Sequence, residues 1–338
     1  MRSITRLVLV WSLGIAGYSY GLMHRAEVPQ ASPSQSGAVD WATYGFPGPA
    51  GGNLIGCALA PEPEDYASEA AFRSMLEVCL LVARERGFLN EKSVLVLPRH
   101  VGTPLFLLGE DAEVLRIAVE SRDEAAYAIA RTRPLAVLSH LPFVDLSDPT
   151  IMEAVVRAKA GRSLAVLQRV VSDLAQTYRV TIASGTISGP EPILVDGQLA
   201  TSFGPLCETG FVFRSDGALA PEFVRSDCGS DPDGPAPAVF ESPAGFFAVL
   251  TDRDLTREQS LPEPVGGRVR FLVAQTANDS RDVLMRFALA RVIYAGLQVE
   301  NRTRLWGRAP EDTGGVIERG NFRNLPAGTG MLVVNLWL

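Results

Sequence analysis

The chain has 338 residues, of which 47% are hydrophobic and 20% charged, so it can bury a large core and is neither disordered nor fibrous. Its formal net charge of -7 and the lack of any Lys/Arg run exclude nucleic acid as an expected partner. The four cysteines and three histidines show no metal-ligand spacing, so we expect no metal and no other cofactor. The sequence leaves the disulfide state open for Cys57, Cys79, Cys207 and Cys228.

The N-terminus carries a targeting signal. Arg2 and Arg6 precede an apolar run from Leu7 to Met23, which predicts a signal peptide or membrane anchor over residues 1–27. The run is shorter than the roughly 20 residues of a spanning helix, which leaves a cleaved signal peptide open. No small-x-small cleavage site follows, which favours an uncleaved anchor. In both cases the basic residues place the rest of the chain on the extracytoplasmic side, either secreted or attached to the membrane by this segment.

Residues 28–52 are rich in proline, serine and glycine and predict a flexible linker, so we expect a single domain over residues 53–338. The domain opens with a buried strand at Asn53–Pro61, a helix at Tyr66–Arg86 and a second strand at Ser93–Pro98. Together these elements predict a strand, helix, strand unit.

The middle of the domain predicts helices between Asp111 and Arg131, then a strongly amphipathic helix that ends near Tyr178 and leads into a strand. A strand, turn, strand unit follows at Ala238–Asp252, and Ser280–Gln298 predicts a helix behind a capping cluster. The last forty residues are rich in strands and glycine turns. This alternation is typical of an α/β fold with a mixed sheet covered by helices.

Three segments, in their order and spacing, carry a family resemblance. They are SVLVLPRHVGTPLFLLGE (Ser93–Glu110), GFVFRSDGALAPEFVR (Gly210–Arg225) and ESPAGFFAVLTDRDL (Glu241–Leu255). Over Asn53–Leu338 the chain resembles the carbon-nitrogen hydrolase (nitrilase) superfamily as a divergent member. The resemblance implies a nitrilase-like α-β-β-α sandwich and a homodimer that pairs through helical faces.

The family's Glu-Lys-Cys triad is substituted in this chain. Arg99 stands at the glutamate position, Arg225 at the lysine position and Asp252 at the cysteine position. In the family the glutamate takes the thiol proton, the thiolate attacks an amide or nitrile carbon, and the lysine stabilises the developing negative charge. An arginine stays protonated and cannot be that base, and an aspartate is a far weaker nucleophile than a thiolate. The resemblance therefore implies that ordinary family hydrolysis is lost.

Two interpretations of these positions stay open. Arg99, Arg225 and Asp252 could form a binding site for a small anionic or amide ligand, because arginine pairs bidentately with a carboxylate. Alternatively, Asp252 forms an internal salt bridge with one of the arginines, because buried charges need partners. Both interpretations favour a pseudoenzyme that acts by binding or assembly. The alternative function is an active amidase-type hydrolase that uses other residues.

Other catalytic arrangements have less support. The chain has no GxSxG, Walker or HExxH motif. His100 could serve as a base with Thr251 or Ser184 as the hydroxyl nucleophile, but no motif places these side chains together. A lipid acyltransferase of the same superfamily is a third idea, and it would need several membrane spans that the sequence does not predict.

Overall fold

The computed structural model describes residues 39–47, 51–140, 151–226, 237–251, 254, 269–275, 284–285, 293, 295–302, 305–307, 314–319 and 321–338. All of them belong to one compact unit, residues 31–338. The predicted targeting segment, residues 1–27, lies outside the described residues. Within the described part of the chain, no helix is both long and apolar enough to cross a membrane.

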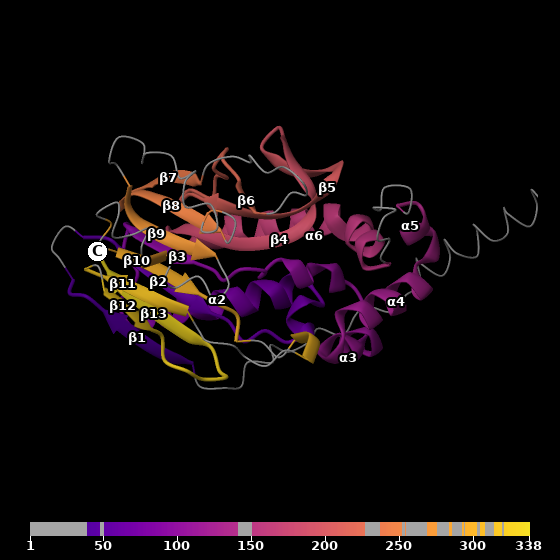
Figure 1. Ribbon diagram of the computed structural model, residues 1–338, viewed down its shortest axis with the longest axis horizontal. Helices are drawn as coiled ribbons and strands as arrows, with labels where there is room; N and C mark the ends of the chain where they lie inside the picture. Colours follow the sequence, from indigo (N-terminus) through magenta and orange to yellow (C-terminus); the bar gives the residue numbers. More distant parts are fainter. Residues whose placement is uncertain are drawn as a thin grey trace, which may run out of the picture. The chain divides into compact units, whose positions relative to one another are not determined.

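The described strands form two mixed sheets (Figure 1). The seven-stranded sheet has the order β1-β13-β2-β3-β4-β5-β6, and the six-stranded sheet has the order β12-β11-β10-β9-β8-β7. In the first, β2, β3 and β4 are parallel while β13 and β5 run antiparallel to them; in the second, β8, β9 and β10 are parallel. The strands are β1 (Asp40–Tyr44), β2 (Asn53–Ala58), β3 (Ser93–Val96), β4 (Thr181–Val195), β5 (Gln198–Phe213), β6 (Val224–Ser226), β7 (Ala238–Ser242), β8 (Gly245–Thr251), β9 (Val269–Gln275), β10 (Ala295–Val299), β11 (Gly314–Glu318), β12 (Asn321–Asn324) and β13 (Leu332–Trp337).

Three of the helices begin at side-chain caps. Ser68 accepts a hydrogen bond from Ala71 N at the start of α2, and Asp111 and Ser121 cap α3 and α4 in the same way. The helices are α2 (Glu69–Glu85), α3 (Ala112–Glu120), α4 (Arg122–Thr132), α5 (Pro134–Leu138) and α6 (Ile151–Tyr178), with 3-10 turns η1 (Pro63–Tyr66), η2 (Thr103–Leu107) and η6 (Leu305–Gly307). The predicted helices at Tyr66–Arg86, between Asp111 and Arg131, and up to Tyr178 are thus confirmed.

Three apolar layers hold the domain together. Helices α2 and α6 pack on one face of the seven-stranded sheet, where Met75 and Val171 are fully buried (Figure 1). The other face packs against the six-stranded sheet, with Val94 and Phe247 in the shared core. The outer face of the six-stranded sheet packs against further residues that include the helical Leu284. The predicted α-β-β-α sandwich is therefore confirmed.

The prediction of a flexible linker over residues 28–52 is wrong for part of that range. Asp40–Tyr44 forms β1, which pairs in parallel with β13 at the edge of the seven-stranded sheet. Only Ala42 and Tyr44 are half-buried against the core, while Trp41 is exposed. Because an edge strand buries so little, its apolar pattern is too weak to separate it from a linker.

The predicted helix at Ser280–Gln298 is wrong at its C-terminal end. Leu284 and Met285 are helical, but Ala295–Val299 forms β10, which lies between β9 and β11. A short apolar run that is buried on both faces has no amphipathic period, so periodicity alone does not distinguish a helix from a strand there. Gly296 packs against Leu272 and Ile317 of the neighbouring strands.

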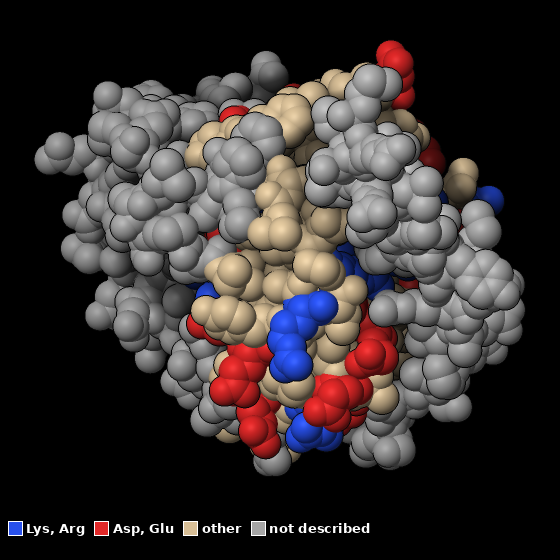
Figure 2. Space-filling view, turned by 90° about the vertical axis from the view of Figure 1, so that its right-hand side faces the viewer, with Lys and Arg blue, Asp and Glu red and all other residues tan. Residues whose placement is uncertain are grey.

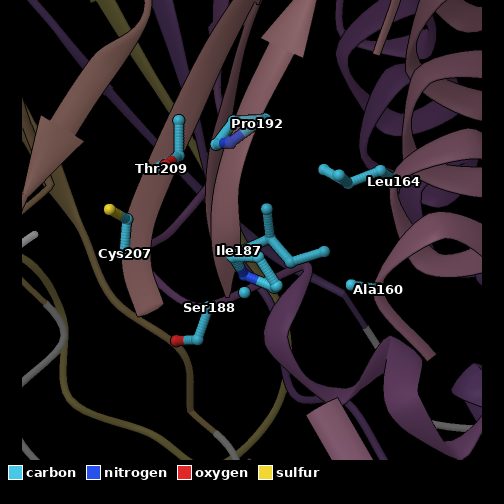
Figure 3. Close-up of a pocket in the computed structure, with 9 residues that line it drawn as sticks. Ala160, Leu164, Ile187, Ser188, Pro192, Cys207 and Thr209 are labelled. Atoms are coloured by element: carbon cyan, nitrogen blue, oxygen red, sulfur yellow. The ribbon is translucent and has the colours of Figure 1, made fainter. Parts of the chain in front are cut away.

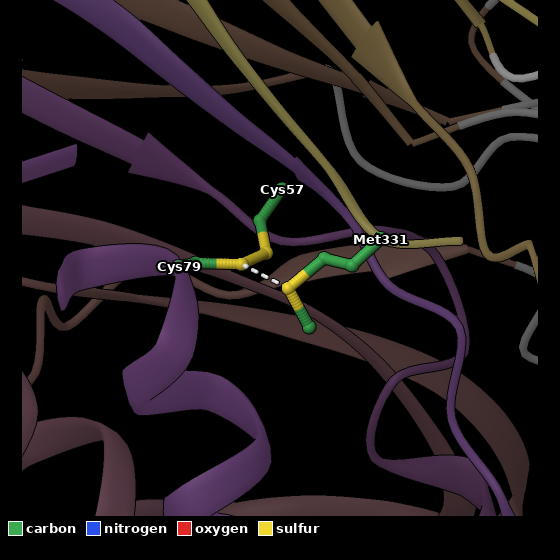
Figure 4. The surroundings of a disulfide bond; sticks show 3 residues. All are labelled: Cys57, Cys79 and Met331. Atoms are coloured by element: carbon green, nitrogen blue, oxygen red, sulfur yellow. Dashed lines mark hydrogen bonds between the residues drawn. A yellow bond between two sulfur atoms is a disulfide. The ribbon is translucent and has the colours of Figure 1, made fainter. Parts of the chain in front are cut away.

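A disulfide joins the sheet to its covering helix. Cys57 of β2 and Cys79 of α2 are bonded, with their Cα atoms 6.1 Å apart, and Met331 Sδ lies 3.6 Å from Cys79 Sγ (Figure 4). All three residues lie in the core between α2 and the sheet. The disulfide state of Cys57 and Cys79, which the sequence left open, is thereby assigned.

Candidate functional site

The site lies where the parallel strands of both sheets end. Strand β3 leads directly to the segment that contains Arg99, and β10 leads to Asn301, whose Nδ2 donates a 2.8 Å hydrogen bond to Arg99 O. Strands β8 and β9 end side by side at the pair Thr251 and Gln275. The carboxyl ends of parallel strands are where α/β folds commonly place ligands.

The loop after β3 is held against β4 by backbone contacts. His100 N donates to Thr186 Oγ1 at 2.9 Å, and Gly102 N donates to Thr186 O at 3.0 Å. Gly185 has a φ of +70°, at a register shift between β4 and β5, and a Cβ there would collide with Pro98 O. The absence of a side chain at Gly185 therefore allows β4 to approach the loop closely.

Arg99 forms a bidentate ion pair with Glu208 of β5. Arg99 Nε donates to Glu208 Oε1 at 2.7 Å and its Nη2 donates to Oε2 at 2.6 Å. Thr186 Oγ1 donates to the same Oε1 at 2.5 Å. Burial alone would raise the pKa of the Glu208 carboxyl. The hydrogen bond from Arg99, the electrostatic attraction of His100 and Arg99, and the hydrogen bond from Thr186 outweigh burial and hold the pKa below its ordinary value. Glu208 is therefore an ionised carboxylate bound in a neutral pair.

This pair occupies the position where the resemblance places a general base. The planar guanidinium of Arg99 is engaged on two nitrogens, and Glu208, the nearby acid, has both oxygens accepting from Arg99. Sequence reasoning missed Glu208 because it lies 109 residues from Arg99 and no motif contains it. The only sequence signal is that Glu208 is the one charged residue of β5.

The other two triad positions are only partly described. Arg225 lies in β6 directly opposite Thr209 of β5, next to Glu208, so its backbone is beside the Arg99 pair. Its side chain is not described. Asp252 follows the last residue of β8 and lies outside the described residues. The structure thus places the backbone of Arg225 on the strand next to Glu208, the partner of Arg99.

Cys207 lies beside Glu208 in β5 but is not a free thiol. Cys207 is disulfide-bonded, and consecutive strand residues face opposite sides of the sheet. Its neighbours Ser188, Ile187 and Thr209 line a small cavity with α6 (Figure 3). That cavity has a volume of about 10 Å³, room for roughly one water molecule. It is too small for a ligand, and a disulfide sulfur cannot act as a thiolate nucleophile.

A larger cavity lies beside the ion pair. It has a volume of about 300 Å³, and His100, Thr103 and Ser188 line it. His100 Nδ1 is 3.3 Å from Thr103 Oγ1 and 3.5 Å from Glu208 Oε1, and Thr103 Oγ1 is 3.2 Å from Ser188 Oγ. The sequence did not predict that the hydroxyls of Thr103 and Ser188 belong to the site.

The hydroxyls that the sequence suggested for His100 have other contacts. Thr251 Oγ1 donates to Asp254 Oδ2 at 2.8 Å, and Ser184 Oγ donates to Gly185 O at 3.0 Å. Thr103 is the hydroxyl that contacts His100. Within the described ranges, no group of three or more His, Cys, Asp or Glu side chains could hold a metal ion.

Comparison with known proteins identifies the fold. No protein-family model matches the chain, and no curated protein matches its sequence. Among solved structures, an amidase of the nitrilase superfamily from Nesterenkonia AN1 aligns with a TM-score of 0.51 and 12% identity over 85% of this chain and 92% of that chain. The Nesterenkonia amidase in complex with butyramide aligns with a TM-score of 0.50 and 13% identity, over 86% of this chain and 94% of that chain.

The comparison with solved structures also found a yeast protein. Nit3 from Saccharomyces cerevisiae, a member of branch 10 of the nitrilase superfamily, aligns with a TM-score of 0.49 and 13% identity over 85% of this chain and 90% of that chain. The alignments with the two amidase structures show that this chain has the nitrilase-superfamily fold, as its sequence resemblance predicted.

Proposed function

We propose that this chain is a nitrilase-fold binding protein that does not hydrolyse amides or nitriles. The observation that carries the proposal is the bidentate pair between Arg99 and Glu208 at the position of the family's base. A general base must hold an accessible lone pair near its pKa, and a guanidinium holds none at any ordinary pH. The charges of the pair also cancel, which argues against Arg99 as the centre of an anion site.

The cysteines support the same proposal. The family chemistry needs a thiolate, yet Cys57, Cys79 and Cys207 are all disulfide-bonded. Disulfides persist in oxidising compartments, so these bonds also favour the extracytoplasmic location that the N-terminal segment predicts. Membrane anchoring through residues 1–27 and a homodimer belong to the same proposal and rest on the sequence and the resemblance.

A second candidate function is an active C-N hydrolase that uses hydroxyl groups. The observation that favours it is the row of contacts from Ser188 through Thr103 to His100. In a working triad the hydroxyl and the acid face different nitrogens of the imidazole. Here Thr103 and Glu208 both approach Nδ1, so the ring is not placed to relay a proton between them. We therefore rank this candidate second.

An assay of ammonia release from small amides and nitriles tests the proposal. The wild type should release no more ammonia than a protein-free blank. Any turnover by the wild type would overturn the proposal. Thr103→Val and Ser188→Ala test the second candidate, because loss of that turnover in either variant would establish the hydroxyl enzyme.

A variant that restores the family's triad tests whether the substituted triad positions account for the absence of hydrolysis. The variant combines Arg99→Glu, Arg225→Lys and Asp252→Cys with Glu208→Gln, since the new carboxylate would otherwise face Glu208. We expect measurable turnover only in this combination. The matched control is Arg116→Glu, a charge reversal on the exposed face of α3, which should leave the rate at the blank value.

A further inference from the structure

The 300 Å³ cavity beside the ion pair has features of a ligand site. His100, Thr103 and Ser188 form one wall and Trp306 of η6 another, while Arg122 and Asp123 at the start of α4 lie on its rim. Its volume is at the lower end of the roughly 300–1,000 Å³ that is usual for small-molecule sites. The lining therefore comes from four separate parts of the chain.

Backbone strain is concentrated at this cavity. Among the described residues, five other than glycine have a positive φ. Arg179 follows the end of α6, and Asp196 and Arg319 lie in turns between antiparallel strands, where such a φ is ordinary. The other two, His100 with φ 60° and Trp306 with φ 63°, both line the cavity. A bulky residue in this conformation costs free energy, and such strain is characteristic of functional sites.

The charges around the cavity are largely balanced. The Arg99 guanidinium is neutralised by Glu208. At the rim, Arg122 Nε lies 3.6 Å from Asp123 Oδ1, and the Arg122 guanidinium carbon lies 5.9 Å from the centre of the Trp306 ring. The exposed Glu120 is within electrostatic range of Arg116. Figure 2, which faces the side that carries α4 and α5, shows acidic and basic side chains intermixed.

The inner wall suits a ligand that both donates and accepts hydrogen bonds. The hydroxyls of Thr103 and Ser188 can do either, as can the imidazole of His100. The Trp306 ring offers a flat apolar surface for C–H groups. Sugars and other polyols combine these features, since their hydroxyls face one way and their C–H groups another.

We infer that this cavity binds a neutral polyhydroxyl compound, with the ring of a sugar over Trp306 and its hydroxyls on Thr103 and Ser188. The inference rests on the proposed function, because it names the class of ligand that this binding protein takes. A charged ligand fits less well, because the cations Arg99 and Arg122 are each paired with a carboxylate, Glu208 and Asp123 respectively, and Glu120 is exposed to water.

Tryptophan fluorescence of the full chain tests the inference. The probes are glucose and N-acetylglucosamine as neutral sugars, with gluconate as the matched anion and glucosamine as the matched cation. At least one neutral sugar should give a saturable change in fluorescence, and the charged analogues should bind at least tenfold more weakly. The change should vanish in Trp306→Phe and persist in Trp41→Phe, the control on β1.

Ser188→Ala should weaken the binding of the neutral sugar about tenfold, the loss expected for one hydrogen bond of about 1.4 kcal/mol. Ser139→Ala, which removes an exposed hydroxyl at the end of α5, should leave it unchanged. Preferred binding of gluconate or glucosamine would overturn the ligand class. Binding of no probe, or a change that survives Trp306→Phe, would overturn the site. Both results differ from the one that would overturn the proposed function, because that result is turnover of an amide or nitrile.

Discussion

Two buried carboxylates of this fold, Glu110 and Glu208, have similar exposure but different surroundings. Glu110 is 2% exposed, pairs with Lys159 of α6, and lies 3.2 Å from Nε of Arg133 between α4 and α5. Glu208 is 7% exposed and pairs with Arg99 at the ends of the parallel strands, beside His100 and the 300 Å³ cavity. The Glu110 cluster joins helices and loops of the covering layer. The Glu208 pair lies next to the cavity, where a ligand can reach the neighbouring His100.

The cations of the two clusters differ as well. Lys159 is itself buried and donates to Leu108 O at 3.0 Å, and burial lowers the pKa of its ammonium although Glu110 opposes the shift. The Arg99 side chain is 23% exposed. A buried ion pair contributes to stability mainly because each charge would be costly to bury without its partner. We therefore propose that the Glu110 cluster stabilises the fold, whereas the Glu208 pair belongs to the candidate site.

The largest effect is expected from Glu110→Ala. The substitution leaves Lys159 and Arg133 without their shared carboxylate, so the free energy of unfolding should fall by about 3–5 kcal/mol. Urea unfolding followed by circular dichroism measures the loss. The control is Glu113→Ala, which breaks only the exposed pair with Arg116 and should change stability little. Equal losses in the two variants would contradict the structural role of the cluster.

Arg99→Ala should have a smaller effect. Glu208 keeps its hydrogen bond from Thr186 and gains water through the space that Arg99 leaves, so we expect a loss of roughly 1–3 kcal/mol. The same unfolding measurement applies, with Arg116→Ala as the exposed control. A loss as large as that of Glu110→Ala would show that the pair is structural too and would remove the contrast.

The decline of the free energy of unfolding at acid pH should depend on Glu208. Its pKa is depressed in the folded state, so its contribution is present above the ordinary glutamate pKa of 4.5 and is lost as the pH falls through the folded pKa. The free energy of unfolding of the wild type should therefore decline below about pH 4.5. In Glu208→Gln the decline should be shallower. Unfolding at pH 7, 5 and 4 measures it, and parallel curves would contradict the role of the ion pair.

The smallest effect is expected from replacing the whole pair. Arg99→Met with Glu208→Leu removes both charges together and fills similar volume, so stability should change by less than about 2 kcal/mol. The stability change of the double variant, minus the summed changes of Arg99→Met alone and Glu208→Leu alone, gives the coupling energy of the pair. A coupling near zero would show that Arg99 and Glu208 do not interact in solution.

Much of the fold could be predicted from the sequence because its patterns are local. The parallel strands β2 and β3 are short, mostly apolar runs bounded by turn residues, and α2 has a regular apolar face with a serine cap. β1 and β10 were missed for opposite reasons. β1 is an edge strand that buries little, and β10 is buried so completely that no period remains.

The candidate site was predictable only in part. Arg99 could be found because it lies in a motif that follows a buried strand. Its partner Glu208 could not, since their contact depends on the register of β4 with β5 and on the close approach of Gly185 to the loop. The cavity wall of Thr103 and Ser188 depends on the same register. Long-range pairing of this kind is set by packing that no short segment encodes.

Intact-mass measurement after incubation with fluoroacetamide and acrylamide tests the central claim most directly, because both compounds report a reactive nucleophile without requiring turnover. We expect an unchanged mass for the wild type, since Arg99 and Glu208 neutralise each other and the described cysteines are disulfide-bonded. A stoichiometric adduct that maps to a residue at the ends of the parallel strands would contradict it and show that the site retains a catalytic nucleophile.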